Sequence, residues 1–129
     1  MNKNKKQILV ITSTLPNSLA EWSAQTKSFE PVVVNAHEVA IELCQQRTFD
    51  LAVIDHTDNS IDHKKLAAVL PVFHQEIAIV DYHGETAVEV EDRVVAFFDQ
   101  QKLERFRRLL ILDSTEKNEA GNLPPFSDN

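Results

Sequence analysis

The chain has 129 residues, of which 43% are hydrophobic, and this length suffices for one globular domain with a substantial core. Its formal net charge of −7 disfavours nucleic-acid binding through bulk electrostatics. The single cysteine, Cys44, excludes an internal disulfide bond and fits a small core position better than a nucleophile. Since the sequence shows neither a signal peptide nor an apolar run long enough to span a bilayer, we expect a cytoplasmic protein.

The first half of the chain alternates apolar runs with amphipathic segments. The continuous aliphatic run at 8–11 predicts a strand buried on both faces, and strands are also predicted at 32–34 and over 49–55, where an apolar run ends on Asp55. Hydrophobic residues at helical spacing predict a first helix over about 17–28, and a second helix connects the second strand to the third.

A third helix and a fourth strand continue this alternation. The helix has Leu66, Val69 and Leu70 on its inner face, and the strand is predicted at 77–80. Strands and helices that alternate with short connections predict a parallel sheet with helices on both of its faces. The third strand ends on Asp55, which places this acid at the carboxyl edge of the sheet, where open α/β folds place their chemistry.

The last third of the chain has two competing assignments. In the preferred one, 87–90 is a short fifth strand and a long helix follows it. In the other, 86–107 is one helix and 109–112 is the fifth strand, but no sequence is then left for a closing helix. Residues 114–129 are polar and proline-containing, so we expect a domain over 1–113 followed by a tail or linker.

Residues 7–82 resemble a response-regulator receiver domain of bacterial two-component signalling. The resemblance rests on the strand at 8–11, on the helical segment 39–43 and on the strand at 49–55. It implies a flavodoxin-like, doubly wound, five-stranded parallel sheet in a three-layer αβα arrangement, here with a modified last third and a long C-terminal helix. In receivers the acid that ends the third strand accepts a phosphoryl group, and by register that acid is Asp55.

Three of the four parts that receivers use for phosphorylation are missing from this chain. Thr12 and Ser13 stand where receivers carry an acidic pair, which helps the acceptor aspartate to hold Mg²⁺ through carboxylate oxygens. Asp81, followed by Tyr82, stands where receivers place a small hydroxyl residue as a switch. Neither candidate for the fifth strand contains the family's lysine. The resemblance therefore implies a degenerate pseudo-receiver in which Asp55 is a vestigial acceptor.

The loop after the third strand also carries candidate metal ligands. Asp55, His56, Asp58, Asp62 and His63 lie within nine positions, but their spacing matches no established metal motif. A polar loop followed by the exposed first turn of a helix, where acids are favoured, is the preferred interpretation of these residues. We therefore predict no metal, no cofactor and no catalytic residue, with a small α/β enzyme or metal-binding domain as an alternative.

The helix predicted for the last third carries more apolar residues than one buried face needs. Val95, Phe98, Phe106, Leu109 and Leu110 cover more than one stripe, which indicates burial under the tail or against a partner. The interleaved basic residues are more typical of a solvated helix face than of a nucleic-acid site. We predict a homodimer or a docking surface for a signalling protein there, without binding to nucleic acid or membranes.

Taken together, these patterns favour a non-catalytic, receiver-like signalling module of the two-component type. It is expected to act by protein–protein association and not through the usual magnesium-dependent phosphorylation. An atypical response regulator that still accepts phosphate at Asp55 is the first alternative, and the small enzyme or metal-binding domain is the second.

Overall fold

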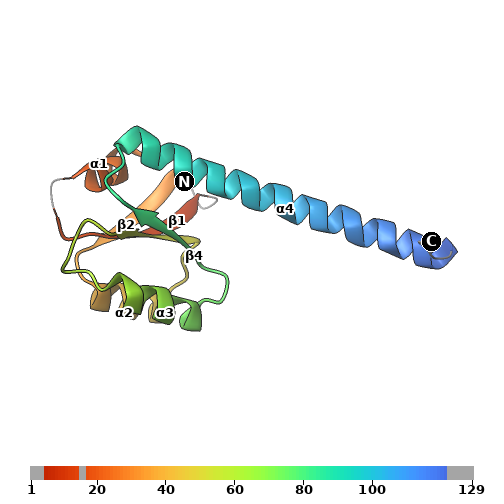
Figure 1. Cartoon of the computed structure of the whole chain (residues 1–129), viewed down its shortest axis with the longest axis horizontal. Coiled ribbons are helices and arrows are strands. Elements are labelled where there is room, and N and C mark those ends of the chain that lie inside the picture. Colours follow the sequence, from red (N-terminus) through yellow and green to blue (C-terminus); the bar gives the residue numbers. More distant parts are fainter. Residues whose placement is uncertain (1–4, 15–16, 122–129) are drawn as a thin grey trace. The chain divides into compact units, whose positions relative to one another are not determined.

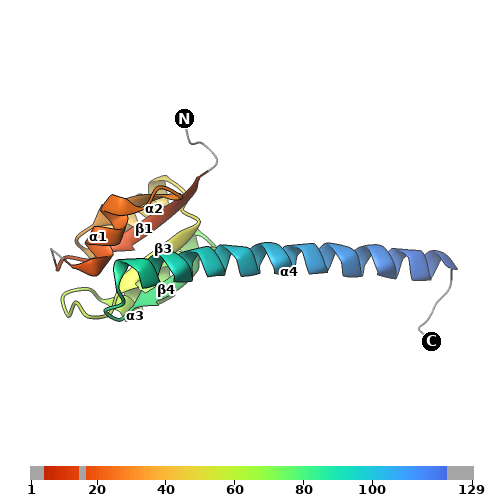
Figure 2. The same ribbon diagram turned by 90° about the horizontal axis from the view of Figure 1, so that it is seen from above.

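The computed structural model describes residues 5–14 and 17–121, with side chains as far as Ile111 (Figure 1). The chain divides into two compact units, one up to Glu91 and one from Asp92 onward, and each is described by itself. In chain order the elements are β1 (Lys6–Ile11), α1 (Ser18–Gln25), β2 (Phe29–Val34), α2 (His37–Gln46), β3 (Leu51–Asp55), α3 (His63–Phe73), β4 (Ala78–Tyr82) and α4 (Ala87–Gly121). α4 is one continuous helix that begins in the first unit and continues through the second (Figure 2).

The first unit contains a parallel sheet of four strands in the order β2-β1-β3-β4. Parallel neighbours need a crossover connection, and α1, α2 and α3 supply these crossovers. α1 lies on one face of the sheet, while α2 and α3 lie side by side on the other (Figure 1). The predicted parallel sheet with helices on both faces is thus confirmed.

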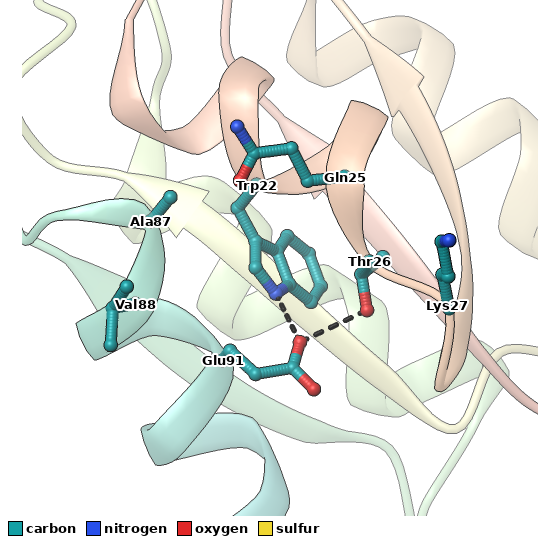
Figure 3. Close-up of a pocket in the computed structure, with 7 residues that line it drawn as sticks. All are labelled: Trp22, Gln25, Thr26, Lys27, Ala87, Val88 and Glu91. Atoms are coloured by element: carbon teal, nitrogen blue, oxygen red, sulfur yellow. Dashed lines mark hydrogen bonds between the residues drawn. The ribbon is translucent and has the colours of Figure 1, made fainter.

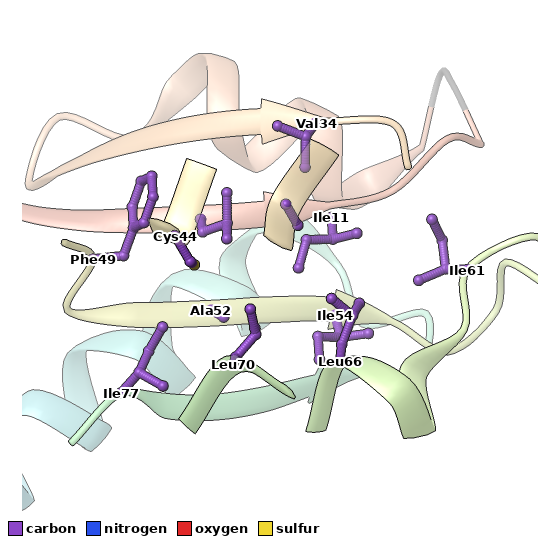
Figure 4. Close-up of a cluster of buried hydrophobic side chains, with 12 residues drawn as sticks. Ile11, Val34, Cys44, Phe49, Ala52, Ile54, Ile61, Leu66, Leu70 and Ile77 are labelled. Carbon is purple, nitrogen blue, oxygen red and sulfur yellow. The ribbon is translucent and has the colours of Figure 1, made fainter. Parts of the chain in front are cut away.

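The two central strands form the middle of the core. Residues 8–11 of β1 and 51–54 of β3 are at most 1% exposed. On the face covered by α2 and α3, side chains of these strands pack with apolar residues of the helices, among them Cys44, Leu66 and Leu70 (Figure 4). Cys44 is buried, which confirms its predicted core position, and burial raises the pKa of its thiol.

The predicted fifth strand is wrong in both assignments. Residues 87–90 form the first turn of α4, and 109–112 lie further along the same helix, so the sheet of the described chain has four strands and not five. A capping box explains where the helix begins. Oγ1 of Thr86 accepts a hydrogen bond from the N–H of Glu89 at 3.2 Å, and Oε1 of Glu89 accepts one from the N–H of Thr86 at 2.9 Å. These two reciprocal hydrogen bonds cap the N-terminus of α4, so 87–90 begins a helix and not a strand.

The long C-terminal helix is present and extends further than expected in both directions. α4 continues to Gly121, so residues 114–121 of the expected tail are helical, and 122–129 lie outside the described residues. Within the described chain, no helix combines the length and the apolar character that crossing a bilayer requires.

We expect the substitution Leu70→Ala to destabilise the first unit by about 2–5 kcal/mol, because Leu70 is fully buried in the core beneath α3 and its loss leaves a cavity. Urea unfolding followed by circular dichroism measures this change. The control Val72→Ala, on the same helix at 74% exposure, should stay within about 0.5 kcal/mol of the wild type. Equal losses in the two variants would contradict the assigned core.

Candidate functional site at the carboxyl edge of the sheet

The carboxyl ends of three strands bring polar residues to one edge of the sheet. Thr12 directly follows β1, Asp55 ends β3, and Tyr82 ends β4 in register with Asp55. Thr12 and Asp55 are both fully buried, and Tyr82 is only 4% exposed. Burial, together with the nearby carboxylates of Asp55 and Glu85, raises the pKa of the Tyr82 hydroxyl. Asp55 therefore lies at the carboxyl edge of the sheet, as the strand at 49–55 predicts, and it is closed off from solvent.

Both carboxylate oxygens of Asp55 accept hydrogen bonds from neutral donors. Oδ2 accepts from Oγ1 of Thr12 at 2.6 Å and from Nδ2 of Asn17 at 3.3 Å. Oδ1 accepts from the backbone N–H of Thr57 at 2.8 Å and from its hydroxyl at 2.5 Å. A buried carboxylate is costly unless such bonds replace its hydration, and here four of them do so. Both side-chain oxygens of Asp55 are thus engaged within the protein.

Asn17 connects this carboxylate to the start of α1. Its Oδ1 caps the helix by accepting a hydrogen bond from the N–H of Ala20 at 2.8 Å. Its Nδ2 donates to Oγ1 of Thr12 at 3.1 Å as well as to Asp55. One buried acid therefore ties together the end of β1, the beginning of α1 and the loop after β3. The sequence analysis missed Asn17, although an asparagine just before an apolar helical pattern is a recognised capping signal.

A second acid, Asp58, holds the same loop to the segment after β1. Asp58 is 6% exposed, and its Oδ2 accepts from the N–H of Ser13 at 2.8 Å and from the Ser13 hydroxyl. Its Oδ1 accepts from the N–H and the hydroxyl of Ser60, at 3.0 and 2.7 Å. Burial alone would raise the pKa of Asp58, but these hydrogen bonds outweigh it and hold the pKa well below its usual range. Ser13, which stands at one of the two positions where receivers carry an acidic pair, therefore donates hydrogen bonds to Asp58.

Three histidine rings gather beside these two acids. Nε2 of His56 lies 2.7 Å from Oδ1 of Asp81, so the residue at the degenerate switch position binds His56. The ring of His56 stacks on that of His63, with centroids 4.1 Å apart, and is tilted against that of His83 at 4.8 Å. Stacked rings do not aim their nitrogen lone pairs at a common point.

The five candidate metal ligands of this loop have other partners in the structure. Asp55 and Asp58 are engaged as described, and Asp62 caps α3 by accepting from the N–H of Lys65 at 3.1 Å. Among the residues that the structure describes, no three histidine, cysteine, aspartate or glutamate side chains are placed to hold a metal ion. The arrangement fixes loops to one another through hydrogen bonds.

A separate small pocket of about 260 Å³ lies between α1 and the first turn of α4 (Figure 3). Oε1 of Glu91 accepts hydrogen bonds from Nε1 of Trp22 at 2.7 Å and from Oγ1 of Thr26 at 2.9 Å. The indole of Trp22 is 2% exposed, so it offers little surface to a ligand. The hydrogen bonds of Glu91 thus attach the start of α4 to α1. No pattern in the sequence predicted this contact.

In the second unit, most of the predicted interaction residues lie on the surface. Val95, Phe106, Leu109 and Leu110 are 37%, 59%, 62% and 52% exposed, whereas Phe98 is buried at 7%. Two further apolar residues are open to solvent, Leu103 at 43% and Ile111 at 65%. Among the described side chains of α4, the exposed apolar residues are therefore most closely spaced over 103–111.

Comparison with known proteins adds no relative to this description. The chain matches no protein-family model, no curated protein and no solved structure. The geometry of the site is thus the basis for any statement about function.

Replacing Thr12 by valine keeps the shape of the side chain and removes the hydroxyl that bonds Asp55. We expect a loss of about 1–3 kcal/mol, because a buried carboxylate loses a donor at 2.6 Å. Urea unfolding of Thr12→Val tests this, with the exposed Thr14→Val as the matched control. A loss no larger than that of the control would show that the Thr12–Asp55 bond does not stabilise the fold.

The lowered pKa of Asp58 predicts a pH-dependent contribution to stability. Its charged form is favoured in the folded state, so the stabilisation is complete at neutral pH and declines as pH falls below about 4, the ordinary range for aspartate. Asp58→Asn should therefore be less stable than the wild type at pH 7, and the difference should shrink in acid. Unfolding curves at both pH values measure it, and an unchanged difference would contradict the assignment.

Proposed function

We propose that this chain is a receiver-like signalling module that does not use phosphoryl transfer and acts by associating with another protein. The observation that carries the first part is the saturation of the Asp55 carboxylate by Thr12, Asn17 and Thr57. The strand order β2-β1-β3-β4 supports the likeness to a receiver, because it equals the flavodoxin-like order without its last strand.

Phosphoryl transfer to an aspartate needs a free carboxylate oxygen and a cation that screens the charge of the transferring group. Asp55 is 0% exposed, and both of its oxygens already accept hydrogen bonds. Thr12 donates to Asp55 from the position where an acidic ligand for Mg²⁺ is expected, and the hydroxyl of Ser13 bonds Asp58. A hard cation would have to replace these bonds without gaining a carboxylate pair.

Association with a protein partner is supported by apolar side chains that are exposed to solvent. Single exposed apolar residues are ordinary on a protein surface. Residues 103–111 of α4, however, expose five of them within nine positions: Leu103, Phe106, Leu109, Leu110 and Ile111. Apolar side chains exposed at this density are typical of a surface that binds a partner. Because the single cysteine also suits a reducing compartment, we place the module in the cytoplasm.

Incubation with acetyl phosphate and Mg²⁺, followed by intact-mass analysis, tests this proposal. We expect no phosphoryl adduct on the wild type, as on Asp55→Asn, under conditions that label an ordinary receiver domain. Amide NMR spectra recorded with Mg²⁺ and then with beryllofluoride should show no change around Asp55. An adduct that disappears in Asp55→Asn would instead establish an atypical phosphoacceptor, and zinc-induced shifts at His56 and His63 would favour the metal-binding alternative.

A further inference from the structure

The sheet of the first unit has two outer strands, β2 and β4, and β4 is an apolar strand at an open edge. It has a neighbour on one side only, because no fifth strand follows it in the described sheet (Figure 1). Ala78, Ile79 and Val80 are only half-buried, whereas the residues of β3 that pair with them are at most 1% exposed. Open apolar edges of this kind are the places where a sheet accepts a further strand.

The main chain of Ile79 is directed to the open side of β4. The C=O of Tyr82 accepts a hydrogen bond from the N–H of His56 at 2.9 Å, so the main chain of Tyr82 is directed towards β3. Alternate residues of a strand share a direction, so Ile79 directs its N–H and C=O away from β3. A donor and an acceptor thus stand at the middle of this edge.

The opposite edge of the sheet, formed by β2, is protected against the same kind of pairing. The C=O of Val34 accepts a hydrogen bond from the N–H of Thr12 at 3.0 Å, so the main chain of Val34 is directed towards β1. By alternation, Pro31 and Val33 are directed away from β1. Proline has no N–H, so the middle of this edge lacks a donor. Proline at such a position is an established device against edge-to-edge association.

β4 is complementary to a second copy of itself in the antiparallel orientation. With Ile79 opposite the same residue of the second copy, the two residues exchange both of their N–H···O=C bonds. Asp81 then stands opposite Ile77, and Ala78 stands opposite Val80. No charged residue of the strand therefore faces a like charge, which would disfavour the pair.

The helix that covers this half of the sheet leaves room for a second copy. α2 contacts β1 and β2, so α3, which lies beside α2, covers the half formed by β3 and β4. Lys65 and Val69 line a groove on the α2 side of α3. At about 3.6 residues per turn, Ala67 and Pro71 lie on the opposite flank, which faces the β4 side of the sheet. This flank carries short side chains that permit the close approach of another α3.

We propose that two copies of this chain associate by antiparallel pairing of their β4 strands about a two-fold axis. The pairing forms one sheet of twice the width, in the order β2-β1-β3-β4-β4-β3-β1-β2. Both of its outer strands carry Pro31 at an outward position, so the assembly closes at two copies. This inference goes beyond the proposed function, because it uses a surface separate from the exposed apolar residues at 103–111 of α4.

Amide hydrogen exchange of the wild-type chain, measured by NMR at several protein concentrations, tests the pairing. An N–H on an open edge exchanges readily with water, whereas an N–H that is bonded to a second strand is protected. We expect the N–H of Ile79 to exchange at least about tenfold more slowly in concentrated than in dilute solution. The N–H of Val33, at an outward position of β2, is the matched control and should exchange at the same rate in both.

Proline substitution removes the same N–H by mutation. Neither Ile79→Pro nor Val33→Pro removes a donor from the ladder to the neighbouring strand, because both N–H groups are directed outward. In sedimentation velocity, Ile79→Pro should weaken the dimer by at least about tenfold, and Val33→Pro should leave it unchanged. Circular dichroism establishes that each variant is folded. Should Ile79→Pro not fold, the exchange measurement decides, since it needs no substitution.

The outcomes separate this inference from the proposed function. A chain that stays monomeric at every concentration overturns the pairing of β4. A dimer in which the exchange of Ile79 does not depend on concentration, or which a folded Ile79→Pro leaves unchanged, also overturns it and assigns self-association to another surface. None of these results alters the phosphoryl test of Asp55, and an adduct on Asp55 does not affect the pairing.

Discussion

The buried carboxylate of Asp55 is the interaction on which the carboxyl edge of this sheet depends. It receives hydrogen bonds from Thr12, Asn17 and Thr57, and thereby joins the end of β1, the N-terminus of α1 and the loop after β3. Burial of a carboxyl group in this position is tolerated because these donors replace its hydration. Asp58, further along the same loop, likewise accepts hydrogen bonds from Ser13 and Ser60. The edge where open α/β folds place their chemistry is here used to fix loops.

The central part of the fold follows directly from the sequence, whereas its last third does not. The aliphatic run at 8–11, which lies within the βαβ alternation, predicts a strand buried on both faces, and the same alternation places Asp55 at the sheet edge. Residues 87–90 and 109–112 are short runs rich in apolar residues, and such a run does not distinguish strand from helix. The capping box of Thr86 and Glu89 marks the start of a helix before 87–90, and this signal is present in the sequence. The partners of Asp55 depend on loop conformation, which no local pattern predicts.

The absence of a fifth strand from the described sheet also bears on association. As a strand, 109–112 would have been buried; as part of α4, Leu109, Leu110 and Ile111 are 52–65% exposed. Apolar area left in water at this density is costly unless a partner removes it, at roughly 25 cal/mol per Å². The basic residues around these side chains favour a partner with an acidic surface.

The side-chain oxygens of Asp55, which already accept four hydrogen bonds, are expected to have no capacity left for a cation. The ¹³C chemical shift of Cγ of Asp55, followed by NMR while Mg²⁺ is added to millimolar concentration, measures that capacity at the atom concerned. We expect the shift to stay constant, because both oxygens keep their hydrogen bonds to Thr12 and Thr57. A saturable change at Cγ of Asp55, without a matching change at the carboxyl carbon of Asp58, would contradict it.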